Sequence, residues 1–73
     1  MLRGWIIEAL VALGGSGTVV DVARHIWENH ETELRASGDL FYKWQYEMRW
    51  VGRSLVEDKI IIKQSRPRLW ILR

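Results

Sequence analysis

The chain of 73 residues has no cysteine, one proline and two histidines. Disulfides therefore cannot stabilise this small fold, and two histidines without cysteine do not make the usual ligand set of a structural zinc site. The longest apolar run, Trp5 to Leu13, is interrupted by Glu8 and is too short to span a bilayer. Its spacing is that of an amphipathic helix and not of a signal peptide. We therefore expect a cytoplasmic protein with no metal, no cofactor and no membrane segment.

Tryptophan stands out instead, with five copies in a chain that is 48% hydrophobic and 27% charged. This composition is typical of a globular protein and not of a disordered chain. A chain of this length has room for one core, so residues 1–73 are predicted to form a single domain, either a whole protein or a domain of a longer one. Each buried aromatic side chain removes about 150–250 Å² from water, so inward-facing tryptophans can supply much of the core.

Charge is distributed unevenly along the chain. Residues 1–39 carry three basic and six acidic side chains, a net charge of −3, whereas residues 40–73 carry eight basic and three acidic side chains, a net charge of +5. A basic half that faces one way attracts a polyanion such as nucleic acid.

The first part of the chain predicts two helices separated by a glycine-rich turn. Apolar residues recur at three- and four-residue steps over residues 2–13, which predicts a first helix that the glycines of residues 14–17 end. No phosphate-loop lysine follows these glycines, so they are interpreted as a helix stop and not as a nucleotide site. Thr18 followed by Asp21 resembles a capping box, and it predicts a second helix of about three turns over residues 19–30.

The third predicted helix follows a polar connection over residues 31–38, in which Leu34 is the one apolar anchor. Ser37 and Asp39 are both candidate caps for this helix. Its core-facing seam steps by three and four residues along the chain. The seam consists of Phe41, Trp44, Met48, Val51 and Leu55.

The opposite face of the third helix combines aromatic and basic side chains. It presents Tyr42, Tyr46, Arg49, Trp50 and Arg53, with Lys43 and Gln45 beside them. Exposed faces rarely carry so many aromatic residues, which favours a binding surface. The alternative is a solvated face with helix-stabilising ion pairs at four-residue spacing, Lys43 with Glu47 and Arg53 with Glu57.

From Ile60 onward the pattern changes to β-branched and alternating residues. It predicts a two-stranded hairpin over residues 60–63 and 68–72, with a turn over 64–67 in which Pro67 sits, because proline removes a ladder donor. The predicted fold class is therefore α+β, with three helices followed by a β-hairpin. This is the element order of a winged helix-turn-helix, in which the third helix docks in the DNA major groove.

Several residues in the second half also match a particular family. They are Trp50-Val51, Leu55, Ile60-Ile61 and Trp70. The chain resembles the N-terminal winged-helix domain of Mrr-type restriction endonucleases. In that family glycine is common at the positions of Lys59 and Arg68, and the position of Trp50 favours packing against the wing. The resemblance implies recognition of DNA in a restriction or defence system, without the nuclease activity, because the nuclease domain that follows in those enzymes has no counterpart in this sequence.

The predicted DNA-binding residues fall into two groups. Lys43, Gln45 and Arg49 are expected to reach base edges, because arginine pairs with guanine and glutamine with adenine. Contacts to phosphates are expected from Tyr42, Tyr46 and Arg53 on the helix and from Lys63, Arg66 and Arg68 on the hairpin. The expected partner is double-stranded DNA, bound by a small regulator or by the targeting domain of a larger nuclease.

No catalytic constellation is visible in the sequence, so an enzyme is not expected and no small-molecule substrate is implied. His25 and His30 are interpreted as structural histidines. Glu28, Glu31 and Glu33 are interpreted as a solvated surface and not as metal ligands. Acidic Glu31, Glu33 and Asp39 before the third helix disfavour simple DNA docking. The alternative function is therefore a protein-interaction domain or homodimer that uses Tyr42, Tyr46 and Trp50.

Overall fold

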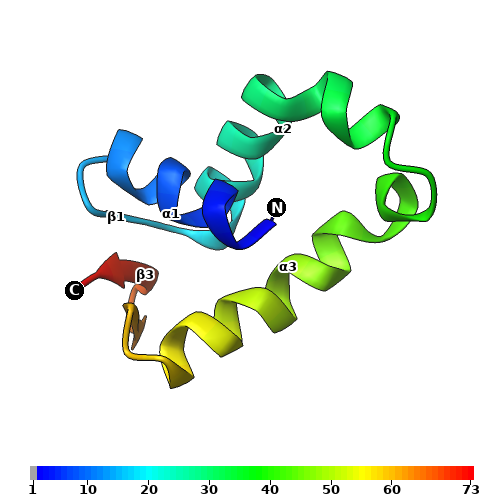
Figure 1. Cartoon of the computed structure of the whole chain (residues 1–73). Helices are drawn as coiled ribbons and strands as arrows, with labels where there is room; N and C mark the ends of the chain where they lie inside the picture. The colour runs from blue at the N-terminus through cyan, green and yellow to red at the C-terminus, as the bar shows by residue number, and fades with distance from the viewer. Residues whose placement is uncertain (1) are drawn as a thin grey trace.

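A computed structural model describes residues 2–73 as three helices and a small sheet (Figure 1). The elements are α1 (Leu2–Ala12), β1 (Ser16–Gly17), α2 (Val19–Arg35), α3 (Asp39–Glu57), β2 (Ile61–Ser65) and β3 (Arg68–Leu72). The strands form an antiparallel sheet in the order β1-β3-β2. The predicted α+β class with three helices and a C-terminal hairpin is confirmed.

The predicted hairpin is present, but the prediction that it forms the whole sheet is wrong, because a third strand pairs with it. Ser16 pairs with Ile71 and Gly17 with Trp70, so the end of the glycine-rich segment joins the sheet as β1. A side chain at position 17 would place its Cβ 2.8 Å from Leu13 Cδ1, so glycine permits this close approach. Strand β2 also runs two residues further than predicted, to Ser65.

The predicted end of the first helix and the predicted start of the second are confirmed. Gly14 and Gly15 have φ values of +87° and +105°, and the Gly15 N–H donates to the Leu10 carbonyl at 2.7 Å, which ends α1. At the start of α2, the Asp21 N–H donates to the Thr18 hydroxyl at 3.0 Å while the Thr18 N–H donates to the Asp21 carboxylate at 3.2 Å. The capping box satisfies two of the backbone donors that a helix start leaves free.

The second helix is longer than predicted. It kinks at His30 (φ −130°, ψ 20°) and then continues to Arg35, so residues 31–35 are helical and not an irregular connection. Leu34 is fully buried, which confirms it as the apolar anchor of this segment. In a straight helix Leu34 would lie about 80° away from Ile26 around the axis. The apolar periodicity therefore breaks at the kink although the helix does not end there.

Neither predicted cap of the third helix is used. The residue that precedes α3 is Gly38, at φ +64°, and it makes no side-chain capping bond. The Ser37 hydroxyl instead donates to the Leu34 carbonyl at 2.5 Å and closes the end of α2. The far end of α3 is tied to the first helix, because Arg3 forms an ion pair with Asp58 at 2.7 Å.

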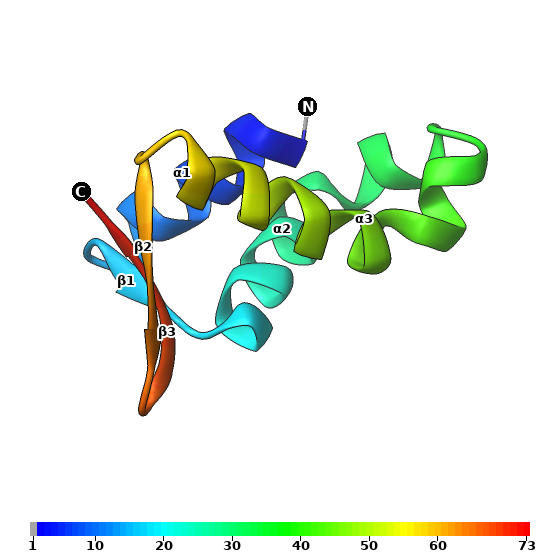
Figure 2. The ribbon, with the colours of Figure 1, turned by 90° about the horizontal axis from the view of Figure 1, so that it is seen from below.

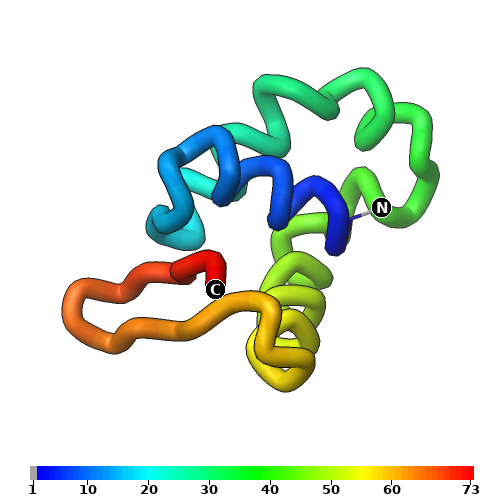
Figure 3. Tube along the Cα trace, turned by 60° about the vertical axis from the view of Figure 1, so that its left-hand side comes forward, coloured from blue at the N-terminus to red at the C-terminus, as the bar shows by residue number. Residues whose placement is uncertain are grey.

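One core joins all three helices and the sheet. Its buried members are Leu2, Trp5, Ile6, Ala9, Leu10, Val22, Ile26, Leu34, Trp44, Met48, Leu55, Ile61 and Trp70. Of the predicted α3 seam, Phe41 and Val51 are only partly buried. Figure 2 shows the β2–β3 hairpin standing across one end of α3, and Figure 3 shows its turn extending away from the helices. The hairpin therefore presents an arm beside the C-terminal end of α3.

The turn between α3 and the hairpin passes through Lys59, which has a φ of +62°. The Ile60 N–H donates to the Leu55 carbonyl at 2.9 Å and the Lys59 N–H to the Val56 carbonyl at 3.0 Å. This is the hydrogen-bond pattern that usually has glycine at the left-handed position. Lysine adopts that conformation here, so the turn that leads into the hairpin forms without glycine.

Candidate nucleic-acid interface

Every predicted DNA-binding side chain is exposed. On α3 these are Tyr42, Lys43, Gln45, Tyr46, Arg49 and Arg53, and on the hairpin they are Lys63, Arg66 and Arg68. The α3 residues are exposed because the buried seam of Trp44, Met48 and Leu55 turns the opposite side of this helix to solvent. The structure therefore places the two groups on adjoining elements, α3 and the hairpin that follows it.

Aromatic residues form one row along the exposed face of α3. Tyr42, Tyr46 and Trp50 are spaced by four residues and are 84%, 63% and 52% exposed. The rings of Tyr46 and Trp50 meet edge to face with centroids 6.3 Å apart. The Arg53 guanidinium lies 6.0 Å from the centre of the Trp50 ring. These contacts join Tyr46, Trp50 and Arg53 in one aromatic and cationic cluster.

The expectation that Trp50 packs against the hairpin is wrong. The residue that meets the hairpin is Gly52, where an added Cβ would lie 2.5 Å from Trp70 Cζ2. Helix α3 turns by about 100° per residue, so Trp50 and Gly52 point in very different directions. The absence of a side chain at Gly52 lets the indole of Trp70 lie directly on the backbone of α3, which leaves Trp50 free to face solvent.

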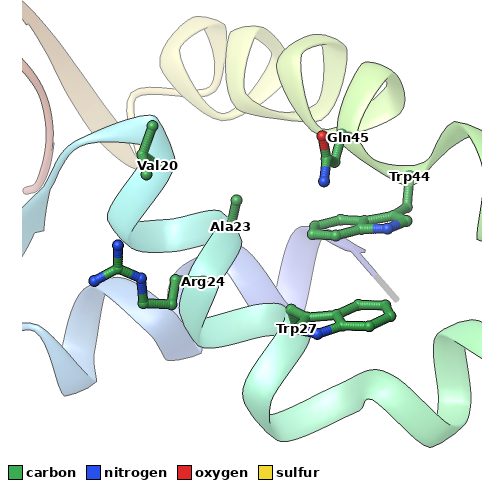
Figure 4. A pocket seen from close by; sticks show the side chains of 6 residues that line it. All are labelled: Val20, Ala23, Arg24, Trp27, Trp44 and Gln45. Carbon is green, nitrogen blue, oxygen red and sulfur yellow. The ribbon is translucent and has the colours of Figure 1, made fainter.

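A groove that the sequence did not predict runs between α2 and α3 (Figure 4). Two adjoining hollows, of about 370 and 270 Å³, share Val20, Ala23 and Gln45. Arg24 lines one hollow and Arg49 the other, and no acidic residue within the described range 2–73 lines either. Gln45 and Arg49 therefore lie toward α2. The one sequence feature that could have indicated this groove is Val20, an apolar residue on the polar side of α2, which is exposed in the structure.

The charges of this surface are mostly unpaired. Arg53 forms an ion pair with Glu57 at 3.3 Å, which confirms one of the two predicted helix pairs. Both side chains are about two-thirds exposed, so the pair contributes little and leaves Arg53 able to change partner. Among residues 2–73, Lys43 forms no ion pair with Glu47, and Arg49 forms no ion pair either.

The acidic connection before α3 is partly neutralised. Glu31 forms an ion pair with Arg35 at 2.8 Å. A carboxylate oxygen of Glu33 lies 3.2 Å from His30 Nδ1 and pairs with the protonated ring. Only Asp39 of the three acidic residues has no such partner in the described part of the chain. Its single exposed charge at the start of α3 repels a phosphate less than three charges would.

His30 is a partly buried histidine that joins α1 to the kink of α2. Its ring stacks on Trp5 with centroids 4.3 Å apart, and its Nε2 lies 2.6 Å from a Glu8 carboxylate oxygen. Burial disfavours the charged ring, but the hydrogen bonds and negative charges of Glu8 and Glu33 together outweigh it and raise the pKa of His30 above 6.5. The other histidine, His25, has a buried Nδ1 atom without a hydrogen-bond partner.

We expect the free energy of unfolding to fall as the pH rises from below 6.5 through the raised folded-state pKa of His30. The folded-state pKa of His30 lies above the ordinary value of 6.5, so its protonation favours the folded protein. This contribution is complete below pH 6.5 and is lost as the pH passes the folded-state pKa. Urea denaturation at a series of pH values measures it. His30→Gln should flatten the pH dependence and Glu8→Gln should reduce it; an unchanged slope in His30→Gln would contradict the assignment.

Other kinds of site are not found in the described part of the chain. Within residues 2–73, no group of three or more histidine, aspartate or glutamate side chains is placed to hold a metal ion. Of the helices in this range, none combines the length and the apolar character that a membrane span needs. Comparison with known proteins gave no matching family model, no similar curated protein and no similar solved structure.

Proposed function

We propose that this chain is a winged helix-turn-helix module that binds double-stranded DNA with α3 and the β2–β3 hairpin. The observation that carries this proposal is the arrangement of the cations: those on α3 and those on the hairpin are all exposed, and they lie on two elements that adjoin in space. The order of three helices and a hairpin supports a winged helix, in which the third helix enters the major groove. Strand β1, which follows α1, pairs with β3 and so holds the base of the hairpin against the rest of the domain.

The proposed roles follow from the side chains and their positions. Lys43, Gln45 and Arg49 reach base edges, and the last two also line the groove beside α2. Arg53, Tyr42 and Tyr46 contact phosphates along the same helix. Lys63, Arg66 and Arg68 bind phosphates from the arm, where they position the domain without choosing a sequence.

The resemblance to the N-terminal domain of Mrr-type restriction endonucleases favours a role in a restriction or defence system. In that setting the module directs a nuclease to its DNA. Used alone, the same surface serves a small regulator. Both settings use the same contacts to DNA, and neither assigns a catalytic reaction to this chain.

Binding to a labelled duplex of mixed sequence, followed by fluorescence anisotropy over a range of salt concentrations, tests the proposal. If Arg53, Lys63, Arg66 and Arg68 each neutralise one phosphate, the logarithm of the affinity should fall against the logarithm of salt with a slope of about −3.6. Binding that does not depend on salt, or no binding at low salt, would overturn the proposal.

Two substitutions separate the roles of the helix and the arm. Arg66→Ala should weaken every duplex alike and reduce the salt slope by about 1. Arg49→Ala should weaken a duplex selected from a random pool by about tenfold or more, and non-selected duplexes much less. Arg3→Gln removes one positive charge from α1, which is not part of the proposed surface, and breaks a half-exposed ion pair with Asp58, so it is the matched control. An equal loss in all three variants would argue against the assigned roles.

A second candidate is a protein-interaction domain, and the exposed row of Tyr42, Tyr46 and Trp50 favours it, because aromatic residues dominate the binding energy of protein interfaces. Sedimentation analysis distinguishes the two. A dimer that depends on protein concentration and is lost in Tyr46→Ala, without salt-dependent DNA binding, would support this candidate over the first.

A further inference from the structure

The aromatic row of α3 is unusual for a helix that reads only base edges. Tyr42, Tyr46 and Trp50 each leave more than half of their surface open to solvent. In a duplex the faces of the bases are covered by their neighbours, and a groove presents only base edges. Three exposed rings in a row would therefore find few free base faces to stack on in an intact duplex.

Positive charges lie on both sides of this row. Helix geometry places Arg49 about 60° to one side of Tyr46 and Lys43 about 60° to the other. All three side chains are exposed. A protein partner that covered the row would have to desolvate these flanking charges or supply matching acids, whereas a nucleic acid strand brings phosphates at regular intervals along its bases.

The spacing of the rings also suits bases. Residues four apart rise about 6 Å along a helix. The rings of Tyr46 and Trp50 are tilted by 68° to each other, so each offers its own outer face and no base lies between them. A strand that lies along α3 can therefore place separate bases on Tyr42, Tyr46 and Trp50 while its phosphates face Lys43 or the row of Arg49 and Arg53.

From this juxtaposition we infer that the aromatic row of α3 binds unpaired bases, so that the preferred ligand is a nucleic acid with a single-stranded segment beside its duplex. Stacking of a base on an aromatic side chain is the interaction that such a row supplies, and it tolerates any base because every base has a π face. This inference rests on the proposed nucleic-acid function and changes one part of it: the arm still holds duplex phosphates, but on a ligand with an unpaired strand Tyr42 and Tyr46 stack on bases instead of contacting phosphates.

The test compares a labelled duplex with the same duplex carrying a single-stranded tail of about 12 nucleotides, a length that one small domain can cover. Fluorescence anisotropy at fixed salt gives both affinities. The tail should increase the affinity about tenfold, which is the lower end of what one or more stacked bases contribute. Trp50→Ala should remove most of this gain while the affinity for the blunt duplex changes less than about twofold. Tyr46→Ala should also reduce the gain.

Two further variants show whether stacking is the cause. Trp50→Tyr keeps an aromatic face and should keep the gain, whereas Trp50→Leu keeps an apolar side chain and should lose it. Val11→Ala truncates an exposed apolar residue on α1 and should leave both affinities unchanged. Circular dichroism confirms that each variant is folded.

The outcomes separate this inference from the proposed function. If the blunt duplex binds with the expected salt dependence but the tail adds nothing, or its gain survives in both Trp50→Ala and Tyr46→Ala, the inference fails and the DNA-binding function stands. If neither DNA binds, both fail. If Trp50→Leu keeps the full gain, base stacking is not its source and the inference is overturned.

Discussion

Replacing Gly52 with alanine is expected to lower the free energy of unfolding by about 2 kcal/mol, although alanine is the better helix former. The new Cβ would lie 2.5 and 2.6 Å from two ring atoms of Trp70. Trp70 is buried and pairs with Gly17 and Lys63 in the sheet, so its ring cannot move away without shifting β3. Overpacking of this kind costs about 1–3 kcal/mol, and valine should cost more than alanine.

A double substitution tests the cause. Phenylalanine at position 70 lacks the indole atoms that the new methyl group would meet, so Gly52→Ala should cost less in a Trp70→Phe background than in the parent. Urea denaturation of the four proteins gives the coupling energy, which should exceed about 0.5 kcal/mol for residues in direct contact. Additive effects would show that the clash with Trp70 is not the reason.

Gly4→Ala is the matched control for helix propensity. Gly4 lies in α1 with no atom within 4 Å of the position of an added Cβ. Here alanine should raise the free energy of unfolding by up to about 1 kcal/mol. Opposite signs for the same substitution in two helices would show that packing against the hairpin, and not helix propensity, decides the effect at Gly52.

Replacing Leu34 with alanine is the second change with a large expected effect, a loss of about 2–5 kcal/mol in the free energy of unfolding. Leu34 is fully buried, although it follows the kink in a stretch that is otherwise largely polar and exposed. The truncation removes the side chain that holds this end of α2 against the core. In so small a domain the loss approaches the whole stability, since about 5–15 kcal/mol is usual for folded domains.

Thermal and urea denaturation followed by circular dichroism measure this loss. Val11→Ala is the control, because Val11 is a well exposed aliphatic residue of α1 and its truncation should change the stability by less than about 0.5 kcal/mol. A similarly small effect at Leu34 would mean that the end of α2 does not pack against the core as described.

Features that depend on neighbouring residues could be predicted well. The capping box of Thr18 and Asp21, the glycine stop after α1 and the seam of Trp44, Met48 and Leu55 all lie within one or two helical turns, where backbone hydrogen bonds and side-chain spacing are local. Exposure of the site residues followed directly from that seam. The resemblance to a nuclease-associated domain and the binding of DNA remain predictions.

Features that depend on distant pairing could not be predicted. Strand β1 has only two residues, one of them glycine, and it exists because β3 offers an edge to pair with. The kink at His30 broke the apolar periodicity and hid the last part of α2. The groove beside Gln45 depends on how α2 and α3 lie against each other, which no local pattern records.

The lack of cysteine excluded disulfides and, with only two histidines, disfavoured a structural zinc site. The five tryptophans indicated that buried aromatic side chains would stabilise the fold instead. By itself the sequence determined the three helices, the hairpin and the basic, aromatic face of α3, because these follow from local spacing and charge. Only the tertiary structure decided which tryptophan joins the core and which faces solvent. Trp70 is buried because Gly52 leaves room for its ring, and Trp50 is exposed because the hairpin meets α3 at that glycine instead.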